Sequence, residues 1–278
     1  MSRDARLPPG LYLVATPIGN LEDMGGRAAR VLREADVVAC EDTRHSAPLL
    51  THVGATGRRL ALHEHNEDKL AHKIVDEVKS GSRVALITDA GMPLISDPGF
   101  PVVREAIRQD IPVTVIPGPS APLAALCLSG LPSARFHFAG FLPDKVSRRQ
   151  ALLEELRELS ATLIFFAPAR ELKEVLSSLE AVLGDRPAAI CRELTKLHEE
   201  VRRGTLKGLQ QEELTLLGEA VVVVGGAEDV AADEHALDNA IRAGLSAGEP
   251  PSSLAKRLAR ELRLSRAAVY ERILALKG

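Results

Sequence analysis

Short apolar runs alternate with longer amphipathic stretches along most of this chain, and this alternation restricts the fold more than any other feature. In the first half, β-branched and apolar runs predict strands near Leu11–Thr16, Asp36–Cys40, Arg83–Thr88 and Pro112–Ile116. Apolar residues at helical spacing predict helices over Glu67–Ser80 and Phe100–Gln109. Strands and helices that alternate in this way form βα units around a mostly parallel sheet, so the first half is predicted to be an α/β domain.

A break at Pro117-Gly118-Pro119-Ser120 separates this half from a second series of elements, because two prolines and a glycine prevent a continuous helix or strand. Further strands are predicted near Phe136–Gly140, Thr162–Phe166, Ala188–Cys191, Glu199–Thr205 and Ala220–Val224, with helices near Arg149–Leu159 and Glu171–Leu183. We therefore expect two α/β domains, residues 1–118 and 119–230, followed by a helical extension over residues 231–278.

The extension is helical from His235 onward and rich in basic residues. One predicted helix carries Leu254, Leu258 and Leu262, a turn with an N-cap follows at Leu264-Ser265, and a further helix carries Val269, Ile273 and Leu276. Between Pro250 and Gly278 there are seven basic residues (Lys256, Arg257, Arg260, Arg263, Arg266, Arg272, Lys277) and two acidic ones (Glu261, Glu271). This pattern is typical of a small helix-turn-helix unit, which either contacts phosphates or caps the second domain with a solvated charged face.

Composition excludes several classes of protein. The chain has no run of 18 apolar residues, and its first nine residues lack the apolar middle of a signal peptide, so we expect no membrane segment and a cytoplasmic location. Cys40, Cys127 and Cys191 have no metal-ligand spacing and are predicted to be small buried residues in a reducing compartment. A net charge of −3, 3% aromatic residues and no Trp mean that any RNA binding depends on local basic patches and shape.

Two loops that follow predicted strands have compositions suited to a small polar ligand. Thr16-Pro17-Ile18-Gly19-Asn20 follows the first strand, and the loop from Asp89 to Gly99 follows the strand Arg83–Thr88. Open α/β sheets bind ligands at the carboxyl ends of their strands. Neither loop has the glycine pattern of a dinucleotide fold or the Gly-Lys-Ser/Thr of a P-loop. Each loop could also be an ordinary rigid connection.

Two clusters of polar residues lie near the ends of other elements. They are Glu41-Asp42-Thr43-Arg44-His45 after the second strand and His63-Glu64-His65-Asn66-Glu67 before a helix. No metal site is predicted, because His63 and His65 share a face only in a strand and no third ligand is adjacent. We expect hydrogen-bonding groups at the mouth of a cleft, with solvated loops as the alternative.

Several separated segments together resemble the bacterial rRNA small subunit methyltransferase I family, which belongs to the tetrapyrrole methylase superfamily. In chain order these are residues 11–23, 41–45, 62–67, 89–99, 117–121, 129–132, 140–143 and 192–200. The helical tail also resembles the C-terminal extension of that family, so the resemblance covers nearly the whole chain.

The resemblance implies two α/β domains with S-adenosyl-L-methionine in the cleft between them, usually as a homodimer. It implies methylation of a cytidine 2′-oxygen in the decoding region of 16S rRNA, within the small ribosomal subunit. The matching motifs assign cofactor contacts to Pro17, Gly19, Asp89, Ala90, Gly91, Met92, Asp97, Ser120, Ala121, Phe166 and Ala167.

The same cleft is predicted to contain four catalytic residues, Glu41, Arg44, His63 and Lys196. A base could be any of Glu41, Asp42, His45, His63, Glu64 or Glu193, while Lys196 or Arg44 could hold a phosphate or lower the pKa of the hydroxyl.

This chain departs from the family pattern in two places. Met92 and Leu94 replace smaller residues, Thr and Gly, in the loop after Asp89. Phe166-Ala167-Pro168-Ala169-Arg170 stands where the family usually has Tyr-Glu-Ser-Pro-His-Arg, so a Glu and a His are missing. Two alternatives remain: a methyltransferase that acts on a tetrapyrrole, and a ribosome-assembly factor without catalytic activity.

Overall fold

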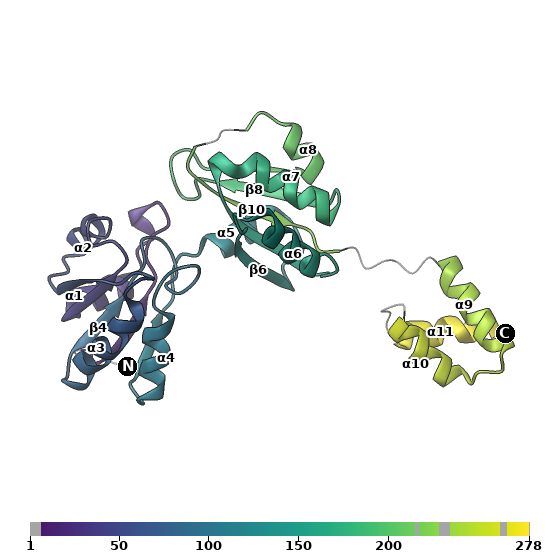
Figure 1. Cartoon of the computed structure of the whole chain (residues 1–278), viewed down its shortest axis with the longest axis horizontal. Helices are drawn as coiled ribbons and strands as arrows, with labels where there is room; N and C mark the ends of the chain where they lie inside the picture. The colour runs from purple at the N-terminus through teal and green to yellow at the C-terminus, as the bar shows by residue number, and fades with distance from the viewer. Residues whose placement is uncertain (1–6, 215–216, 228–233, 262–265, 278) are drawn as a thin grey trace. The chain divides into compact units, whose positions relative to one another are not determined.

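The structure is a computed structural model that describes residues 7–214, 217–227, 234–261 and 266–277. It separates into two compact units, residues 1–157 with 161–225 and residues 158–160 with 226–278, and each is described by itself. The first unit contains two sheets with helices, and the second contains helices (Figure 1). Within the described ranges, no helix is both long and apolar enough to cross a membrane.

The first sheet has five parallel strands in the order β3-β2-β4-β1-β5. They are β1 (Gly10–Val14), β2 (Val37–Cys40), β3 (Arg58–Ala61), β4 (Arg83–Leu86) and β5 (Val113–Ile116), with helices α1 (Gly26–Glu34), α2 (Ala47–His52), α3 (Glu67–Lys79) and α4 (Phe100–Arg108) and the 3-10 turn η1 (Leu21–Asp23) between them. Tyr12 and Val14 pack with α1 and α2, whereas Leu11 packs with α3 and α4. Because both faces of the sheet are covered, its central strands are continuous apolar runs.

The second sheet has the order β6-β7-β10-β8-β9 and is mixed. Its strands are β6 (Phe136–Phe141), β7 (Thr162–Pro168), β8 (Pro187–Arg192), β9 (Glu200–Thr205) and β10 (Glu219–Val224), and its helices are α5 (Ala121–Ser129), α6 (Val146–Leu156), α7 (Leu172–Leu183) and α8 (Leu206–Gln211), with the 3-10 turn η2 (Ala169–Glu171) before α7. Ile164 packs toward α5, while Leu163 and Phe165 pack toward α6 and α7.

The second unit consists of α9 (Glu234–Ser246), α10 (Pro251–Glu261) and α11 (Arg266–Lys277) around a small apolar core. Arg257 pairs with Glu249 at 2.8 Å, and Arg272 pairs with Asp238 at 2.8 Å. The helices predicted near Leu254 and Val269 are confirmed. The predicted turn and cap at Leu264-Ser265 lie outside the described residues, as does Leu262.

Three sequence expectations differ from the structure. Strand β3 was not predicted, because it is an edge strand whose residues are mostly exposed and include two arginines. The mostly parallel arrangement predicted from alternating strands and helices holds for the first sheet but not for the second, where among the described strands only β6 and β7 pair in parallel. The prediction that all three cysteines are buried is wrong for Cys127, which lies on an exposed position of α5, whereas Cys40 and Cys191 are buried.

Candidate active site

The loops that follow β1 and β4 are joined directly to each other. Strands β1 and β4 are parallel neighbours, so their carboxyl ends meet at one edge of the sheet. Beyond the strand ends, the Thr16 N–H donates to Gly91 O at 2.9 Å, and the Gly91 N–H donates to Thr16 O at 3.1 Å. The Thr16 hydroxyl also donates to Thr88 O at 3.2 Å. The two predicted ligand loops therefore form a single substructure.

Glycine is required at two positions of this substructure. Gly91 has a φ of +87°, and a Cβ there would lie 3.3 Å from Ile18 Cγ2. At Gly19, a Cβ would lie 2.6 Å from Lys196 Cγ and 2.9 Å from the Leu194 carbonyl oxygen. A side chain at Gly19 would displace the loop that carries Lys196, so the small size of both residues keeps the loops in place.

A cavity of about 460 Å³ opens beside these loops within the first unit. Its lining comes from the segments after β1 and β4, the start of α5, the ends of β6, β7 and β8, and the start of β10. The predicted site residues among its lining are Asp89, Ala90, Asp97, Ala121, Phe166, Ala167 and Lys196. The structure thus gathers seven predicted residues from four separate segments around one cavity.

The other predicted site residues lie in the part of the chain that the structure describes, but they do not line this cavity. Pro17, Gly19, Gly91 and Met92 belong to the two joined loops, and Ser120 is the N-cap of α5. Glu41 is half-buried directly after β2. Arg44 is exposed, and its N–H donates to Asp42 Oδ1 at 2.7 Å. His63 is exposed in the turn before α3, where its N–H donates to Asn66 Oδ1 at 2.9 Å.

Carboxyl groups gather at the acidic side of the site. Burial raises the pKa of Asp97 to about 6; the nearby Thr88 hydroxyl counteracts this rise, while the negative charges of Glu41 and Asp89 add to it. Burial also raises the pKa of Glu41, with further contributions from Asp89 and Glu64. Mutual repulsion among partly buried carboxylates makes this part of the site favourable for a positively charged group.

Lys196 lies on the cavity wall between two carboxylates. Its ammonium group donates to Glu193 Oε1 at 2.9 Å and to Glu219 Oε2 at 3.1 Å. Burial lowers the pKa of Lys196, but the hydrogen bonds to Glu193 and Glu219 outweigh it, so the pKa lies above the ordinary value. Lys196 is therefore protonated at neutral pH and acts as a cation, which excludes it as a general base.

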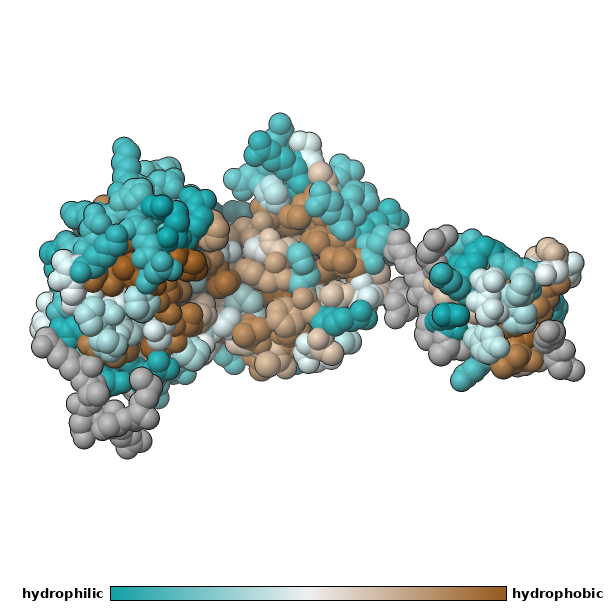
Figure 2. All heavy atoms as spheres, turned by 90° about the horizontal axis from the view of Figure 1, so that it is seen from below, coloured by the Kyte–Doolittle hydropathy of each residue, from teal (hydrophilic) through white to brown (hydrophobic). Residues whose placement is uncertain are grey.

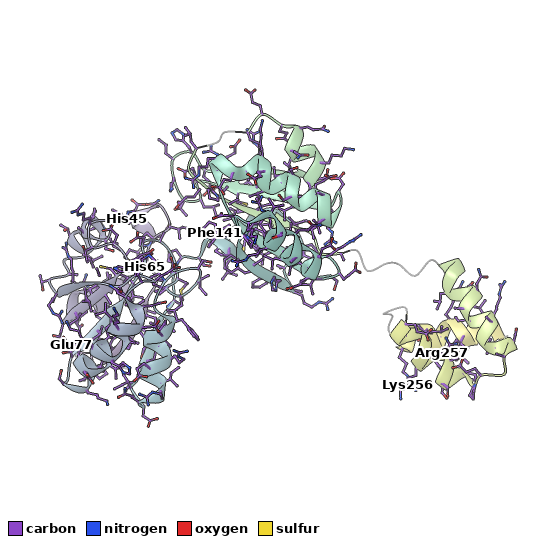
Figure 3. The ribbon with its side chains drawn as sticks, viewed as in Figure 1. His45, His65, Glu77, Phe141, Lys256 and Arg257 are labelled. Carbon is purple, nitrogen blue, oxygen red and sulfur yellow. The ribbon has the colours of Figure 1, made fainter. Side chains whose placement is uncertain are left out.

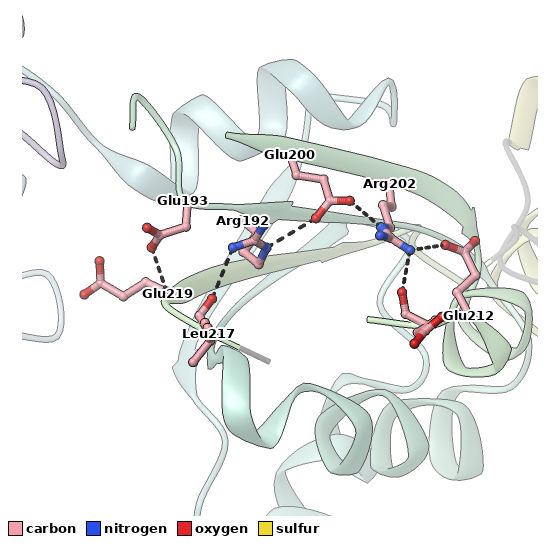
Figure 4. A network of polar contacts seen from close by, with 8 residues as sticks. Arg192, Glu193, Glu200, Arg202, Glu212, Leu217 and Glu219 are labelled. Carbon is pink, nitrogen blue, oxygen red and sulfur yellow. Dashed lines mark hydrogen bonds and ion pairs between the residues drawn. The ribbon is translucent and has the colours of Figure 1, made fainter. Parts of the chain in front are cut away.

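The loop that carries Lys196 is fixed by further polar contacts. Glu193 Oε1 also accepts the N–H of Glu219 at 3.1 Å, and the guanidinium of Arg192 donates to Leu217 O and Glu200 (Figure 4). Glu193 and Thr195 both adopt left-handed backbone conformations, with φ of +49° and +65°. Non-glycine residues in this region cost energy and cluster at functional sites, where surrounding contacts hold them in place.

The loop after β4 has the same feature at Leu94 and Ser96, with φ of +71° and +67°. The family that the sequence resembles is expected to have Gly at the position of Leu94, and Gly adopts this conformation without strain. Here the Leu94 side chain is half-buried against the core of the first sheet. Apolar burial therefore offsets the backbone strain that this departure introduces.

At most positions an Ala variant is more stable than a Gly variant, and at Leu94 we expect the reverse. Leu94→Gly should be more stable than Leu94→Ala by about 1 kcal/mol, because only Ala retains the strain of a left-handed Cβ. Leu60, half-buried against the same core within β3, is the control. There Leu60→Ala should be at least as stable as Leu60→Gly. Denaturant unfolding of the four variants measures both differences, and the same order at both positions would contradict the strain at Leu94.

Sequence reasoning missed part of the cavity wall. Gly218 and Glu219 line it from the start of β10, Ile95 and Ser96 from the loop after β4, and Arg170 from the turn after β7. No sequence pattern distinguishes Glu219 from other surface glutamates. Its place beside Lys196 arises from the antiparallel pairing of β10 with β8. In the described residues no group of three or more His, Cys, Asp or Glu could hold a metal ion.

Comparisons with known proteins identify the family of this chain. Residues 10–210 match the family model of Tetrapyrrole (Corrin/Porphyrin) Methylases. The chain is 51% identical to a ribosomal RNA small subunit methyltransferase I of Mesorhizobium japonicum, over 98% of this chain and 93% of that protein. It is 46% identical to the protein of the same name from Xylella fastidiosa over 95% and 98% of the two chains, and 37% identical to that of Streptococcus pyogenes over 97% and 96%.

Solved structures show the same fold. A uroporphyrin-III-C-methyltransferase from Thermus thermophilus matches with a TM-score of 0.56 and 24% identity, over 78% of this chain and 94% of that one. A diphthine synthase matches with a TM-score of 0.59 and 18% identity, over 77% and 89%. The family match and the near full-length relatives together show that this chain belongs to the tetrapyrrole methylase family, among the ribosomal RNA small subunit methyltransferases I.

Proposed function

We propose that this protein uses S-adenosyl-L-methionine to methylate the 2′-hydroxyl of a cytidine in the decoding region of 16S rRNA. One structural observation carries the proposal. A single cavity has a cluster of carboxylates on one wall and a protonated lysine on another. The carboxylates suit a cationic methyl donor, and the lysine, which is held between Glu193 and Glu219, would supply an N–H donor for an oxygen of the acceptor. The relatives that are named ribosomal RNA small subunit methyltransferase I supply the class of substrate.

The residues present fit the proposed cofactor. A cavity of about 460 Å³ falls within the range of roughly 300–1,000 Å³ of small-molecule sites. Ile18, Ala121 and Val221 line the cavity and would provide apolar contacts, while Asp89 and Asp97 would provide negative charge near a cationic ligand. Pro17, Gly19, Gly91, Met92 and Ser120 would act through the loops that shape the cavity, and Phe166 and Ala167 through its wall.

The reaction depends chiefly on positioning. When bound, the cofactor supplies a methyl group on a positively charged sulfur, so it needs little further activation. The loops would hold the acceptor hydroxyl in line with that group, which can contribute up to about 7–11 kcal/mol. Lys196 would stabilise negative charge on the hydroxyl oxygen or hold the neighbouring phosphate.

Proton removal is a smaller contribution of about 10²–10⁴-fold. Of the predicted catalytic residues, we assign proton removal to Glu41, the one carboxylate among them. It is half-buried directly after β2, and burial and the neighbouring Asp89 and Glu64 raise its pKa. Arg44 and His63 are exposed on neighbouring loops, where they would contact the RNA around the target nucleotide. An assembled small subunit is the preferred substrate, since a net-negative chain with few aromatic residues has little means of gripping free single strands.

We also propose that the helical unit contacts RNA phosphates. Two of its basic residues, Arg257 and Arg272, form ion pairs within the unit. We therefore assign the phosphate contacts to Lys256 and Arg266, which are both exposed. Figure 3 labels Lys256 and Arg257. Lys256→Glu together with Arg266→Glu should weaken binding to small subunits and reduce its salt dependence. Unchanged binding would favour a solvated charged face.

A homodimer in the cytoplasm is the proposed form of the protein. Apolar residues gather on a face of the body that holds β6–β10 (Figure 2), and the exposed large apolar residues of its elements include Leu123, Phe136 and Val146. Exposed apolar residues that gather on one face are a feature of association surfaces. Light scattering should give about twice the chain mass of 29.8 kDa, and a monomer at micromolar concentration would overturn the proposal.

Labelled S-adenosyl-L-methionine tests the proposed reaction most directly. The protein is incubated with small ribosomal subunits from cells that lack this gene, and the label is mapped by nuclease digestion. Label in a 2′-O-methylcytidine of 16S rRNA is the expected result. Label on a base of the RNA would show that the methyl acceptor is not a ribose. Label on uroporphyrinogen, with none on RNA, would show that the acceptor is a tetrapyrrole. Absence of cofactor binding and of any transfer would favour an assembly factor without catalysis.

A further inference from the structure

Aromatic residues are rare in this chain, yet three of them meet at one end of the cavity. The chain has six Phe, two Tyr and no Trp. The rings of Phe138 and Phe166 meet edge-on with centroids 4.9 Å apart, and Phe141 packs on Phe166 at 5.1 Å with a tilt of 48°. Half of the phenylalanines therefore form one cluster, and two of them, Phe141 and Phe166, line the cavity.

A bulge in β6 turns Phe141 toward this cluster. Phe138 pairs with Ile164, whereas Gly140 pairs with Phe165, so Ala139 is an extra residue in the ladder. In a regular strand, residues three apart point to opposite faces of the sheet. One inserted residue reverses this relation, which is why Phe138 and Phe141 both reach Phe166.

The bulge is also fitted to the loop after β4. Gly140 has a φ of +70°, and a Cβ there would lie 3.3 Å from Ser96 Oγ. Glycine at this position therefore permits both the left-handed backbone conformation and the close approach of the loop that contains Asp97. Phe141 is consequently held at a defined place beside the loop, although 53% of its surface is exposed (labelled in Figure 3).

We propose that the Phe141 ring stacks on the base of the nucleotide whose ribose is methylated. This inference rests on the proposed function and names the residue that positions the acceptor. Phe166 packs against the ring, and Phe141 lines the cavity while much of its surface stays exposed, so the ring is accessible to a base. Enzymes that modify RNA commonly receive an unstacked nucleotide on an aromatic side chain. The adenine of the cofactor is the competing occupant of the ring.

Four variants test the proposal in the full-length protein. Phe141→Ala and Phe141→Leu remove the aromatic ring, Phe141→Tyr keeps it, and Phe136→Leu is the matched control. Phe136 lies on the same strand and is 45% exposed, but among the described residues it is not part of the cavity lining. The measurements are kcat/KM for methyl transfer to small subunits and the Kd of labelled S-adenosyl-L-methionine by equilibrium dialysis.

Loss of stacking on one base is expected to lower kcat/KM by about 10- to 100-fold in Phe141→Ala and Phe141→Leu. Phe141→Tyr and Phe136→Leu should stay within about 3-fold of the unaltered protein, and the cofactor Kd should change by less than 2-fold in all four. Equal activity of the Leu and Tyr variants would show that only side-chain volume matters. A parallel loss of cofactor affinity would assign the ring to the cofactor.

Failure of the stacking proposal can be distinguished from failure of the proposed function. If the unaltered protein transfers methyl groups to small subunits and Phe141→Leu is equally active, only the stacking proposal is overturned. If the unaltered protein transfers no methyl group to RNA, the proposed function fails and stacking of the target base fails with it. Circular dichroism melts of the variants show whether any loss of activity comes from unfolding.

Discussion

Replacement of Lys196 by methionine is expected to lower kcat for methyl transfer by about 10²–10³-fold. Methionine keeps much of the length of the side chain but removes the positive charge beside the acceptor site. Because the hydrogen bonds to Glu193 and Glu219 keep Lys196 protonated, the loss is that of a fixed cation, not of a base. Lys196→Arg, which retains the charge, should recover part of the rate. Lys73→Met, at an exposed position of α3, should have no effect.

A structural role of the same lysine can be separated from its catalytic role. Lys196→Met leaves the carboxylate of Glu193, which is largely buried, without its cationic partner, so the single variant should also lose stability. The double variant Lys196→Met/Glu193→Gln removes that unpaired charge and should recover the free energy of unfolding but not kcat. If the double variant recovers kcat as well, Lys196 serves only to neutralise Glu193, and the proposed contact with the acceptor is wrong.

The first sheet was largely predictable because its strands are buried on both faces. Val14, Val38 and Ala85 belong to continuous apolar runs, which identify β1, β2 and β4 without any tertiary information. Strand β3 shows the limit of this signal, since an edge strand with exposed arginines has neither an apolar run nor alternation. Its position is determined by pairing with β2, which a sequence pattern does not encode.

The acidic half of the site was more predictable than its basic half. Asp89 and Asp97 belong to one loop that follows the buried strand β4, and open α/β sheets bind ligands at the carboxyl ends of their strands, so a polar site is expected at this loop. The environment of Lys196 depends on Glu219, which comes from a strand antiparallel to β8. Long-range antiparallel pairing has no local signal, and so this contact could be found only in the folded chain.

The mouth of the cavity was recognised only as a family motif. Residues 140–143 carried the resemblance, but nothing in their sequence indicates that a bulge at Ala139 turns Phe141 to the same face as Phe138. A bulge depends on the register between two strands, which single-sequence patterns do not fix. The physical role of Phe141 therefore emerges from β6 and β7 together.

Affinity for S-adenosyl-L-methionine is expected to increase about 10-fold between pH 5 and pH 7, and Asp97→Asn should remove this dependence. The pKa of Asp97 is about 6, so its carboxyl group becomes ionised within this interval and then attracts the cationic cofactor. Asp89 and Glu41 face the same group, and the pKa of Glu41 is also raised, so Glu41→Gln is measured in parallel. Asp68→Asn, at an exposed position of α3, is the control. If the pH dependence of cofactor affinity persists in Asp97→Asn but vanishes in Glu41→Gln, Glu41 is the group that titrates.

The same substitution should have the opposite effect on folding. The pKa of Asp97 in the folded chain lies above its ordinary value of 3.8, so this carboxyl favours the folded state when protonated, below about pH 4, and that contribution is lost as the pH rises through 6. Asp97→Asn should therefore be more stable than the unaltered protein at pH 7, by roughly 1–2 kcal/mol after allowance for its partial exposure, and the difference should shrink toward pH 4. Urea unfolding of both proteins at several pH values measures this difference in the free energy of unfolding. A variant that is more stable but binds the cofactor less tightly would mean that Asp97 is retained for binding at the expense of stability, whereas reduced stability at pH 7 would make it a structural residue of the loop.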